Sequence, residues 1–151
     1  MRGGFAIGLS GVVALAAATA AQAASTPRQD ELIASYFAIW DRNGNVTADN
    51  VAKLYAPNLV YYGHPMSRAA LLRDKLAFVQ RWPGRRYTVE PGSAAKSCNV
   101  DQSRCEISAT LAWRTEGASG TRSGRSRVHL RLARSDGSLK IVREGAVTLA
   151  R

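Results

Sequence analysis

Side chains that bind metals are scarce in this chain of 151 residues. It has two cysteines and two histidines, and neither His64 nor His129 stands at a zinc-like spacing from the cysteines. Asn50 would occupy the place where a calcium loop needs a bidentate acid. The sequence also contains no glycine-rich phosphate loop and no strand-turn-helix nucleophile motif. We therefore expect neither a metal nor a cofactor.

Acidic residues are few as well. The chain has 11 Asp and Glu against 21 Lys and Arg, a formal charge of +10. A charge of this sign favours anionic partners, although a well-solvated basic surface explains it equally. Nucleic acid is a poor candidate, because no aromatic platform is interleaved with the basic residues.

Long apolar runs are absent except at the N-terminus. Arg2 precedes an apolar stretch over 5–18, and Ala21-Gln22-Ala23 matches a signal-peptidase site. A membrane-spanning helix needs roughly 20 apolar residues, and this stretch is shorter. We therefore expect residues 1–23 to be a cleaved signal peptide and residues 24–151 to form one periplasmic or secreted domain that does not span a membrane.

Cys98 and Cys105, the only cysteines, are separated by six residues. In an exported protein an oxidising compartment makes a disulfide the default state. We expect these two residues to form a structural disulfide at the end of a β-hairpin.

Helical periodicity dominates the first half of the mature chain. Apolar residues from Leu32 to Trp40 recur on one face, which predicts an amphipathic helix. Thr47 is placed to cap a short second helix that ends before Pro57, and Ser67 to cap a third that ends at Pro83. A short strand over 59–62 separates the last two helices.

The period changes to two in the second half. Alternation predicts strands over 87–98, 105–114, 125–134 and 139–149, and Asp136-Gly137 is a hairpin signal. Residues 117–124, rich in glycine and serine, are expected to form a loop. Helices first and strands last indicate an α+β fold, with three N-terminal helices packed on a curved antiparallel sheet.

This order of elements resembles the NTF2-like fold, which includes SnoaL-like and ketosteroid-isomerase-like domains. Locally the chain is similar to exported NTF2-like domains of proteobacteria. The motifs that carry this resemblance are Tyr36-Phe37-Ala38-Ile39-Trp40, Leu54-Tyr55-Ala56, Val60-Tyr61-Tyr62-Gly63, Lys75-x-x-Phe78 and Arg81-Trp82-Pro83-Gly84-Arg85-Arg86-Tyr87. The resemblance implies a helix-lined cone over the concave face of the sheet. Some members bind partners in that cone, and others are isomerases or dehydratases.

Lys75 is the main candidate for a binding residue. It lies on the apolar face of the third helix, so its ammonium either reaches the rim or meets polar partners in a pocket. Tyrosine hydroxyls are the expected partners of such an ammonium. The predicted ligand site, suited to a carboxylate or an enolate, consists of Lys75, Tyr36, Tyr61, Tyr62 and Trp40.

A catalytic group is harder to find. His64 lies in a Gly-His-Pro turn, and because an imidazole can act as a general base it is a candidate base, although such a histidine is usually only solvated. Enzymes of this fold use a carboxylate or histidine inside the cone. Strand alternation places Glu106 and Glu144 on the outer face, so no inward acid is expected.

The same outer face collects basic side chains. It is expected to carry either an anion-binding strip or cross-strand pairs of arginine and glutamate, each pair contributing roughly 0.2–1 kcal/mol. Its members are Arg125, Arg127, His129, Arg131, Glu106, Arg114, Lys140 and Glu144.

Three functions remain open from the sequence. The leading hypothesis is a non-catalytic domain that binds a small, anionic ligand or a protein partner. The second is a small isomerase or dehydratase that uses His64 or a tyrosine together with Lys75. The third is a homodimer that docks on anionic envelope material.

Overall fold

The structure, a computed structural model, describes residues 27–150. The expected signal peptide and its cleavage site lie outside these residues. No helix among the described residues is long and apolar enough to cross a membrane. The elements in chain order are α1 (Pro27–Asp41), a 3-10 turn (Asn43–Asn45), α2 (Ala48–Leu54), β1 (Tyr55–Tyr61), β2 (His64–Ser67), α3 (Arg68–Arg81), β3 (Gly84–Val89), β4 (Ala95–Cys98), β5 (Arg104–Gly117), β6 (Gly120–Ser135) and β7 (Ser138–Leu149).

The helices begin where their caps predict. The Thr47 hydroxyl accepts a hydrogen bond from the backbone N–H of Asn50 at the start of α2. The Ser67 hydroxyl does the same for Ala70 at the start of α3. Each cap satisfies a backbone donor that the first turn of a helix leaves without a partner.

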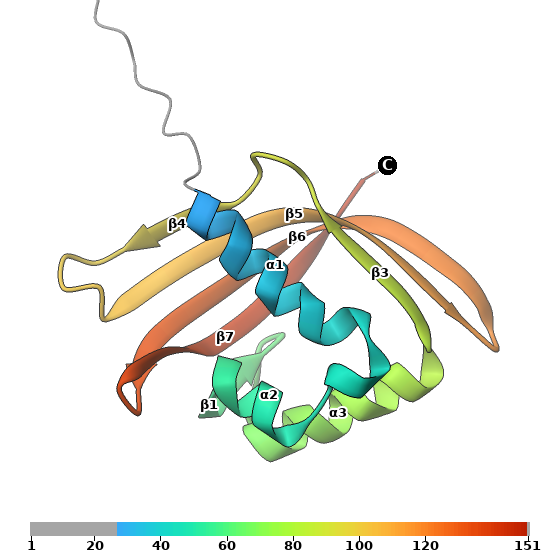
Figure 1. The fold of residues 1–151 in the computed structure, drawn as a ribbon, viewed down its shortest axis with the longest axis horizontal. Coiled ribbons are helices and arrows are strands. Elements are labelled where there is room, and N and C mark those ends of the chain that lie inside the picture. The colour runs from blue at the N-terminus through green and yellow to red at the C-terminus, as the bar shows by residue number, and fades with distance from the viewer. Residues whose placement is uncertain (1–26, 151) are drawn as a thin grey trace, which may run out of the picture.

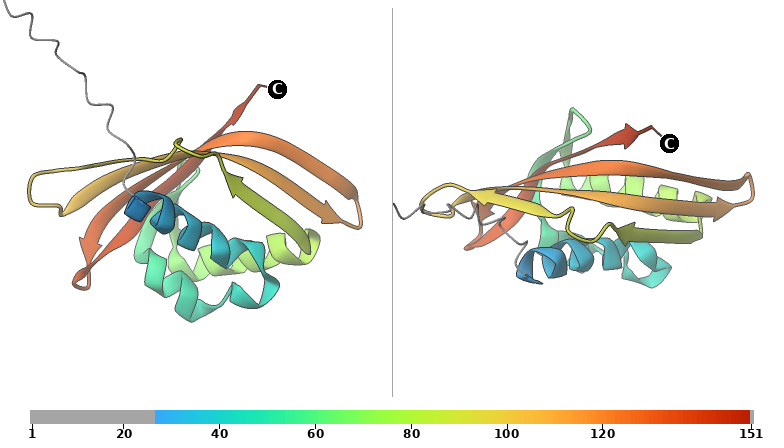
Figure 2. Two further views of the ribbon diagram at one scale, coloured as in Figure 1. Left: turned by 45° about the horizontal axis from the view of Figure 1, so that its top comes forward. Right: turned by 90° about the horizontal axis from the view of Figure 1, so that it is seen from above.

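The sheet is curved, and the helices gather under its arch (Figures 1 and 2). The strand order is β2-β1-β7-β6-β5-β3, and β4 pairs with β5 beyond the end of β3. All strand pairs are antiparallel except β1 with β7, which is parallel. The expected α+β architecture and the expected strand before α3 are therefore present, but the sheet is mixed, and β2 is a second strand before α3.

Several strand boundaries differ from the expectation: β1 begins at Tyr55 and not at residue 59, and β2 was not expected. The predicted strand over 87–98 is divided into β3 and β4 by a turn at Pro91-Gly92, where Gly92 has a φ of 72°. The predicted loop over 117–124 is wrong, because β5 continues to Gly117 and β6 starts at Gly120. Gly124 belongs to this ladder: a Cβ there would lie 2.7 Å from the ring of Trp113. Its lack of a side chain serves a close approach within the sheet.

The core lies between the helices and the inner face of the sheet. Ile33, Val51 and Leu71 contribute from the helices, and Ile107 and Leu130 from the central strands. Cys98 and Cys105 face each other across β4 and β5 and form the expected disulfide. The bridge ties the edge strand β4 to the long strand β5.

Candidate functional site

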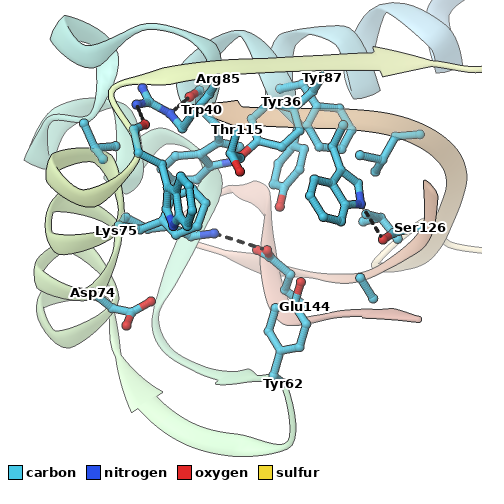
Figure 3. A pocket seen from close by; sticks show the side chains of 18 of the residues that line it. Tyr36, Trp40, Tyr62, Asp74, Lys75, Arg85, Tyr87, Thr115, Ser126 and Glu144 are labelled. Atoms are coloured by element: carbon cyan, nitrogen blue, oxygen red, sulfur yellow. Dashed lines mark hydrogen bonds and ion pairs between the residues drawn. The ribbon is translucent and has the colours of Figure 1, made fainter. Parts of the chain in front are cut away.

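A cavity of about 360 Å³ opens between α1, α3 and the inner face of the sheet (Figure 3). Nine of its 20 lining residues are aromatic, among them Phe37, Phe78, Trp82, Tyr87 and Trp113. Phe37 and Tyr87 stack on each other at 5.5 Å between ring centroids. Concave apolar sites with a few convergent polar groups are the usual form of small-molecule sites.

Lys75 extends from α3 into this cavity, and its side chain is only 14% exposed. Its ammonium lies 4.6 Å from the ring centroid of Trp40 and 4.8 Å from that of Tyr61. The Nζ atom is 3.5 Å from Oε1 of Glu144. Cation–π contacts and a carboxylate together replace the water that the buried charge has lost.

Glu144 corrects the expectation that no acid points inward. Its side chain is 4% exposed, lines the cavity and meets Lys75 near the centre of Figure 3. The hydroxyl of Tyr55, itself fully buried, donates a short hydrogen bond to Oε2 of Glu144. Tyr36 lines the same cavity. The sequence-based placement of Glu144 on the outer face is therefore wrong.

A β-bulge in β7 is the physical reason for this difference. Ile141 is opposite Leu132 and Arg143 is opposite Arg131, so Val142 is an extra residue in β7. An extra residue interrupts the alternation of side chains between the two faces of a strand. Beyond it Glu144 faces the cavity and Arg143 faces outward, the reverse of a regular strand.

The charges within the cavity are stabilised by their pairing. Burial by itself would lower the pKa of Lys75, but the Glu144 carboxylate and then the Tyr61 hydroxyl favour the charged form. The net effect raises the pKa of Lys75 above its ordinary value. Lys75 therefore carries its proton at every physiological pH.

The tyrosines stay protonated for a related reason. Burial and the neighbouring negative charge of Glu144 raise the pKa of Tyr36 and of Tyr55 well above the ordinary value. Burial also raises the pKa of Tyr61 and brings the pKa of Tyr62 to about 12. All four hydroxyls are hydrogen-bond donors at neutral pH.

Two further donors in the wall have no hydrogen-bond partner within residues 27–150. They are the indole Nε1 of Trp40 and Nη2 of Arg85. The rest of the Arg85 guanidinium donates to the carbonyls of Trp40, Trp82 and Pro83, which joins the end of α1 to the end of α3.

The structure brings together all five residues that were expected to form the ligand site. Tyr36, Trp40, Tyr61, Tyr62 and Lys75 line one cavity. Tyr62 stands at the tip of the β1–β2 hairpin, with a φ of 47° and 49% of its side chain exposed.

His64, the candidate base, lies on β2, is exposed, and does not line the cavity. Glu144 and Arg85 also line the cavity, and sequence patterns indicated neither of them as a residue of the site. The register shift in β7 reverses the face on which alternation places Glu144. Arg85 follows Pro83-Gly84, where no periodic pattern indicates the direction of its side chain. Among the described residues there is also no group of three or more histidine, cysteine or acidic side chains placed to hold a metal.

Comparison with known proteins shows the fold. No family model matches the sequence, and no curated protein matches it at a significant level. Solved structures do match. A Salmonella enterica protein of the nuclear transport factor 2 (NTF2-like) superfamily has a TM-score of 0.66 at 10% identity, over 82% of this chain and 92% of that one.

Two other neighbours extend the comparison. A protein from Caulobacter vibrioides with a cystatin-like fold has a TM-score of 0.65 at 13% identity, over 80% of this chain and 87% of that one. A putative scytalone dehydratase from Novosphingobium aromaticivorans has a TM-score of 0.64 at 12% identity, over 82% and 83%. The chain has an NTF2-like fold, and at these identities the likeness carries no function.

Proposed function

We propose that this chain is an exported domain whose cone binds a small ligand with an aromatic or apolar body and a carbonyl or carboxylate group. The observation that carries this proposal is the Lys75 ammonium inside an aromatic cavity. An ammonium has three N–H donors, and Glu144 lies 3.5 Å from it, at the long end for a hydrogen bond. Lys75 can therefore donate to an acceptor on a ligand as well as to its ion-pair partner.

The charges and donors of the lining favour the same kind of ligand. Lys75, Arg85 and Arg122 line the cavity against Asp74 and Glu144, so the lining is positive by one charge. The protonated hydroxyls of Tyr61 and Tyr62, which line the cavity, can add hydrogen bonds to an oxygen acceptor. The disulfide is consistent with the proposed export to an oxidising compartment.

Binding of 2-naphthoate and of 2-methylnaphthalene, two ligands of similar size, tests this proposal. Because a hydrogen bond to a charged group contributes about 1.5–3 kcal/mol, we expect the carboxylate to bind about tenfold or more tightly than the hydrocarbon. Quenching of tryptophan fluorescence measures both affinities. Equal affinities would contradict the role of Lys75.

A variant that removes both buried charges locates the effect. Lys75→Met with Glu144→Gln deletes the ion pair without leaving one charge unpaired, so the fold should persist. The preference for 2-naphthoate should then fall to less than about twofold. The matched control, Lys53→Met with Glu116→Gln, removes the same charges at exposed positions and should keep the full preference.

Acid–base catalysis is a second candidate function, favoured by Glu144. A carboxylate beside an ammonium and protonated tyrosines can move a proton next to a carbonyl group while the donors stabilise the enolate. One neighbour of this fold is a putative scytalone dehydratase and another a putative aromatic ring hydroxylase. Against catalysis, the Tyr55 hydroxyl already engages Oε2, and Lys75 lies beside Oε1.

Deuterium uptake by 2-tetralone in D2O separates the two functions. If the cone only binds, NMR will show the same rate of exchange at the α-carbon with and without the protein. Protein-dependent exchange that is lost in the Lys75→Met, Glu144→Gln variant, but kept in the Lys53→Met, Glu116→Gln control, would establish catalysis instead.

A further inference from the structure

One face of the curved sheet points away from the helices (Figure 2). The pattern of burial along β6 places a row of basic side chains on this face. Arg127, His129 and Arg131 alternate with buried residues along β6, and all three are exposed. Alternate residues of a strand lie about 6.7 Å apart on one face, so this row spans about 13 Å. It is independent of the cone, which opens on the opposite face.

The bulge at Val142 adds a third arginine beside this row. Arg143 is exposed and stands directly opposite Arg131 across β6 and β7. In a regular β7 Glu144 would have shared this face and offered a cross-strand partner. The bulge instead removes an acid from the outer face and adds a base. Like charges that lie directly opposite each other destabilise a sheet.

Neutralisation of this row is incomplete. Glu106 accepts hydrogen bonds from Nε and Nη2 of Arg131 at 3.0 and 2.7 Å. No acidic side chain within residues 27–150 forms an ion pair with Arg127 or Arg143. The fold thus retains an arrangement of charges that costs stability and offers free guanidinium groups to an anion.

Three of these residues border a groove, and Arg127 lies opposite Val147 at its edge. A cavity of about 710 Å³ on this face is lined by His129, Arg131 and Arg143. Gly145, opposite His129, has nothing within 4 Å of the place where a Cβ would lie, so the floor is open there. Two exposed apolar side chains at the edge of the same groove are those of Tyr62, 49% exposed, and Val147, 60% exposed.

We infer that this groove binds an acidic polysaccharide through its carboxylates. Arginine forks match carboxylates in bidentate geometry, and Tyr62 and Val147 offer apolar surface to the C–H faces of sugar rings. The cations of β6 lie on a strand that is paired along both edges, by β5 and by β7, so an acidic peptide cannot be added as a further strand against them.

A second copy of the chain fits this groove less well than an acidic polysaccharide. A two-fold dimer through this face would place the same patch on both subunits, so the rows of cations would face each other.

Titration calorimetry with polygalacturonate tests the inference, and fully methyl-esterified polygalacturonate supplies the same backbone without charge. We expect binding of the acid and none of the ester. Arg127→Gln with Arg143→Gln should weaken binding about tenfold, because two charge-assisted contacts are lost. Arg73→Gln with Arg81→Gln removes equal charge from exposed positions on α3 and should change the affinity less than about twofold.

The variant Arg143→Glu gives a second, opposite readout. It converts the Arg131–Arg143 contact into an attractive pair, so the melting temperature should rise while polygalacturonate binding is lost. A fall in both would show that Arg143 is structural and would overturn the inference. So would equal losses in the two double variants, which would indicate a nonspecific effect of net charge.

Two other outcomes would assign the face to a different partner. Sedimentation that shows a dimer dissociated by Arg127→Gln with Arg143→Gln would make the groove a subunit interface. Retention on phosphatidylglycerol vesicles that is sensitive to the same variant, without polygalacturonate binding, would make it a membrane-binding surface. Either result would overturn the polysaccharide assignment and leave the proposal for the cone unaffected.

Discussion

Replacing Glu144 with glutamine lowers the free energy of unfolding by about 3–5 kcal/mol, because it leaves the buried ammonium of Lys75 without a counter-charge. The glutamine can still accept the hydrogen bond of Tyr55, so the loss reports the charge and not the shape of the side chain. Urea denaturation followed by circular dichroism measures the difference. A loss below about 1 kcal/mol would show that Lys75 reaches solvent, as a surface pair does.

A double-mutant cycle separates the ion pair from its surroundings. Lys75→Met in the Glu144→Gln background removes the unpaired charge, and most of the lost stability should return. The rescue should be specific, since Lys53→Met changes an exposed lysine and should leave the Glu144→Gln variant as unstable as before.

The contribution of the Lys75–Glu144 pair to stability depends on pH, and the direction of the pKa shift of Lys75 determines how. The pKa of Lys75 is raised in the folded protein, so its charged form is favoured by folding. The stabilisation is fully present below the ordinary pKa of 10.5 and is lost as the pH rises above it. The difference in the free energy of unfolding between wild type and the Lys75→Met, Glu144→Gln variant should therefore stay constant between pH 6 and 9.

Local signals in the sequence predicted much of the scaffold. Thr47 and Ser67 cap helices as expected, and Asp136-Gly137 closes the β6–β7 hairpin. These features depend on a few neighbouring residues, so the sequence alone specifies them. Helical spacing predicted that Lys75 lies on the inner face, and this placement is correct because α3 is a continuous helix.

The features that the sequence did not predict depend on pairing between distant segments of the chain. The bulge at Val142 is a property of how β7 pairs with β6, and no residue near it signals an extra position. That one residue exchanges the faces of Arg143 and Glu144, so it decides both the acid in the cone and the cations of the outer groove. The parallel pairing of β1 with β7 is equally invisible to local patterns.

Gly117 joins the far end of the sheet to the end of α3. A Cβ at this position would lie 2.2 Å from the backbone carbonyl oxygen of Arg81 and 3.2 Å from the ring of Trp82. Backbone atoms of a helix end cannot move aside cheaply, in contrast to the tip of a flexible side chain. Gly117 therefore permits the contact that brings the β5–β6 hairpin against the end of α3.

Gly117→Ala should lower the free energy of unfolding by about 3 kcal/mol, the upper part of the range for overpacking, because the clash is with backbone. Gly44→Ala is the matched control, since nothing lies within 4 Å of its Cβ position, and it should change stability by less than about 0.5 kcal/mol. Thermal denaturation of both variants measures the contrast.

The same substitution should weaken ligand binding by opening the cavity. Trp82 and Arg122, which line it, are joined by a cation–π contact of 5.1 Å between the end of α3 and β6. Forcing α3 away from the hairpin separates these two walls, so the affinity for 2-naphthoate should fall in Gly117→Ala and remain in Gly44→Ala. Unchanged affinity in a destabilised Gly117→Ala protein would place the ligand deeper, at Lys75 and Glu144, away from this end of the cone.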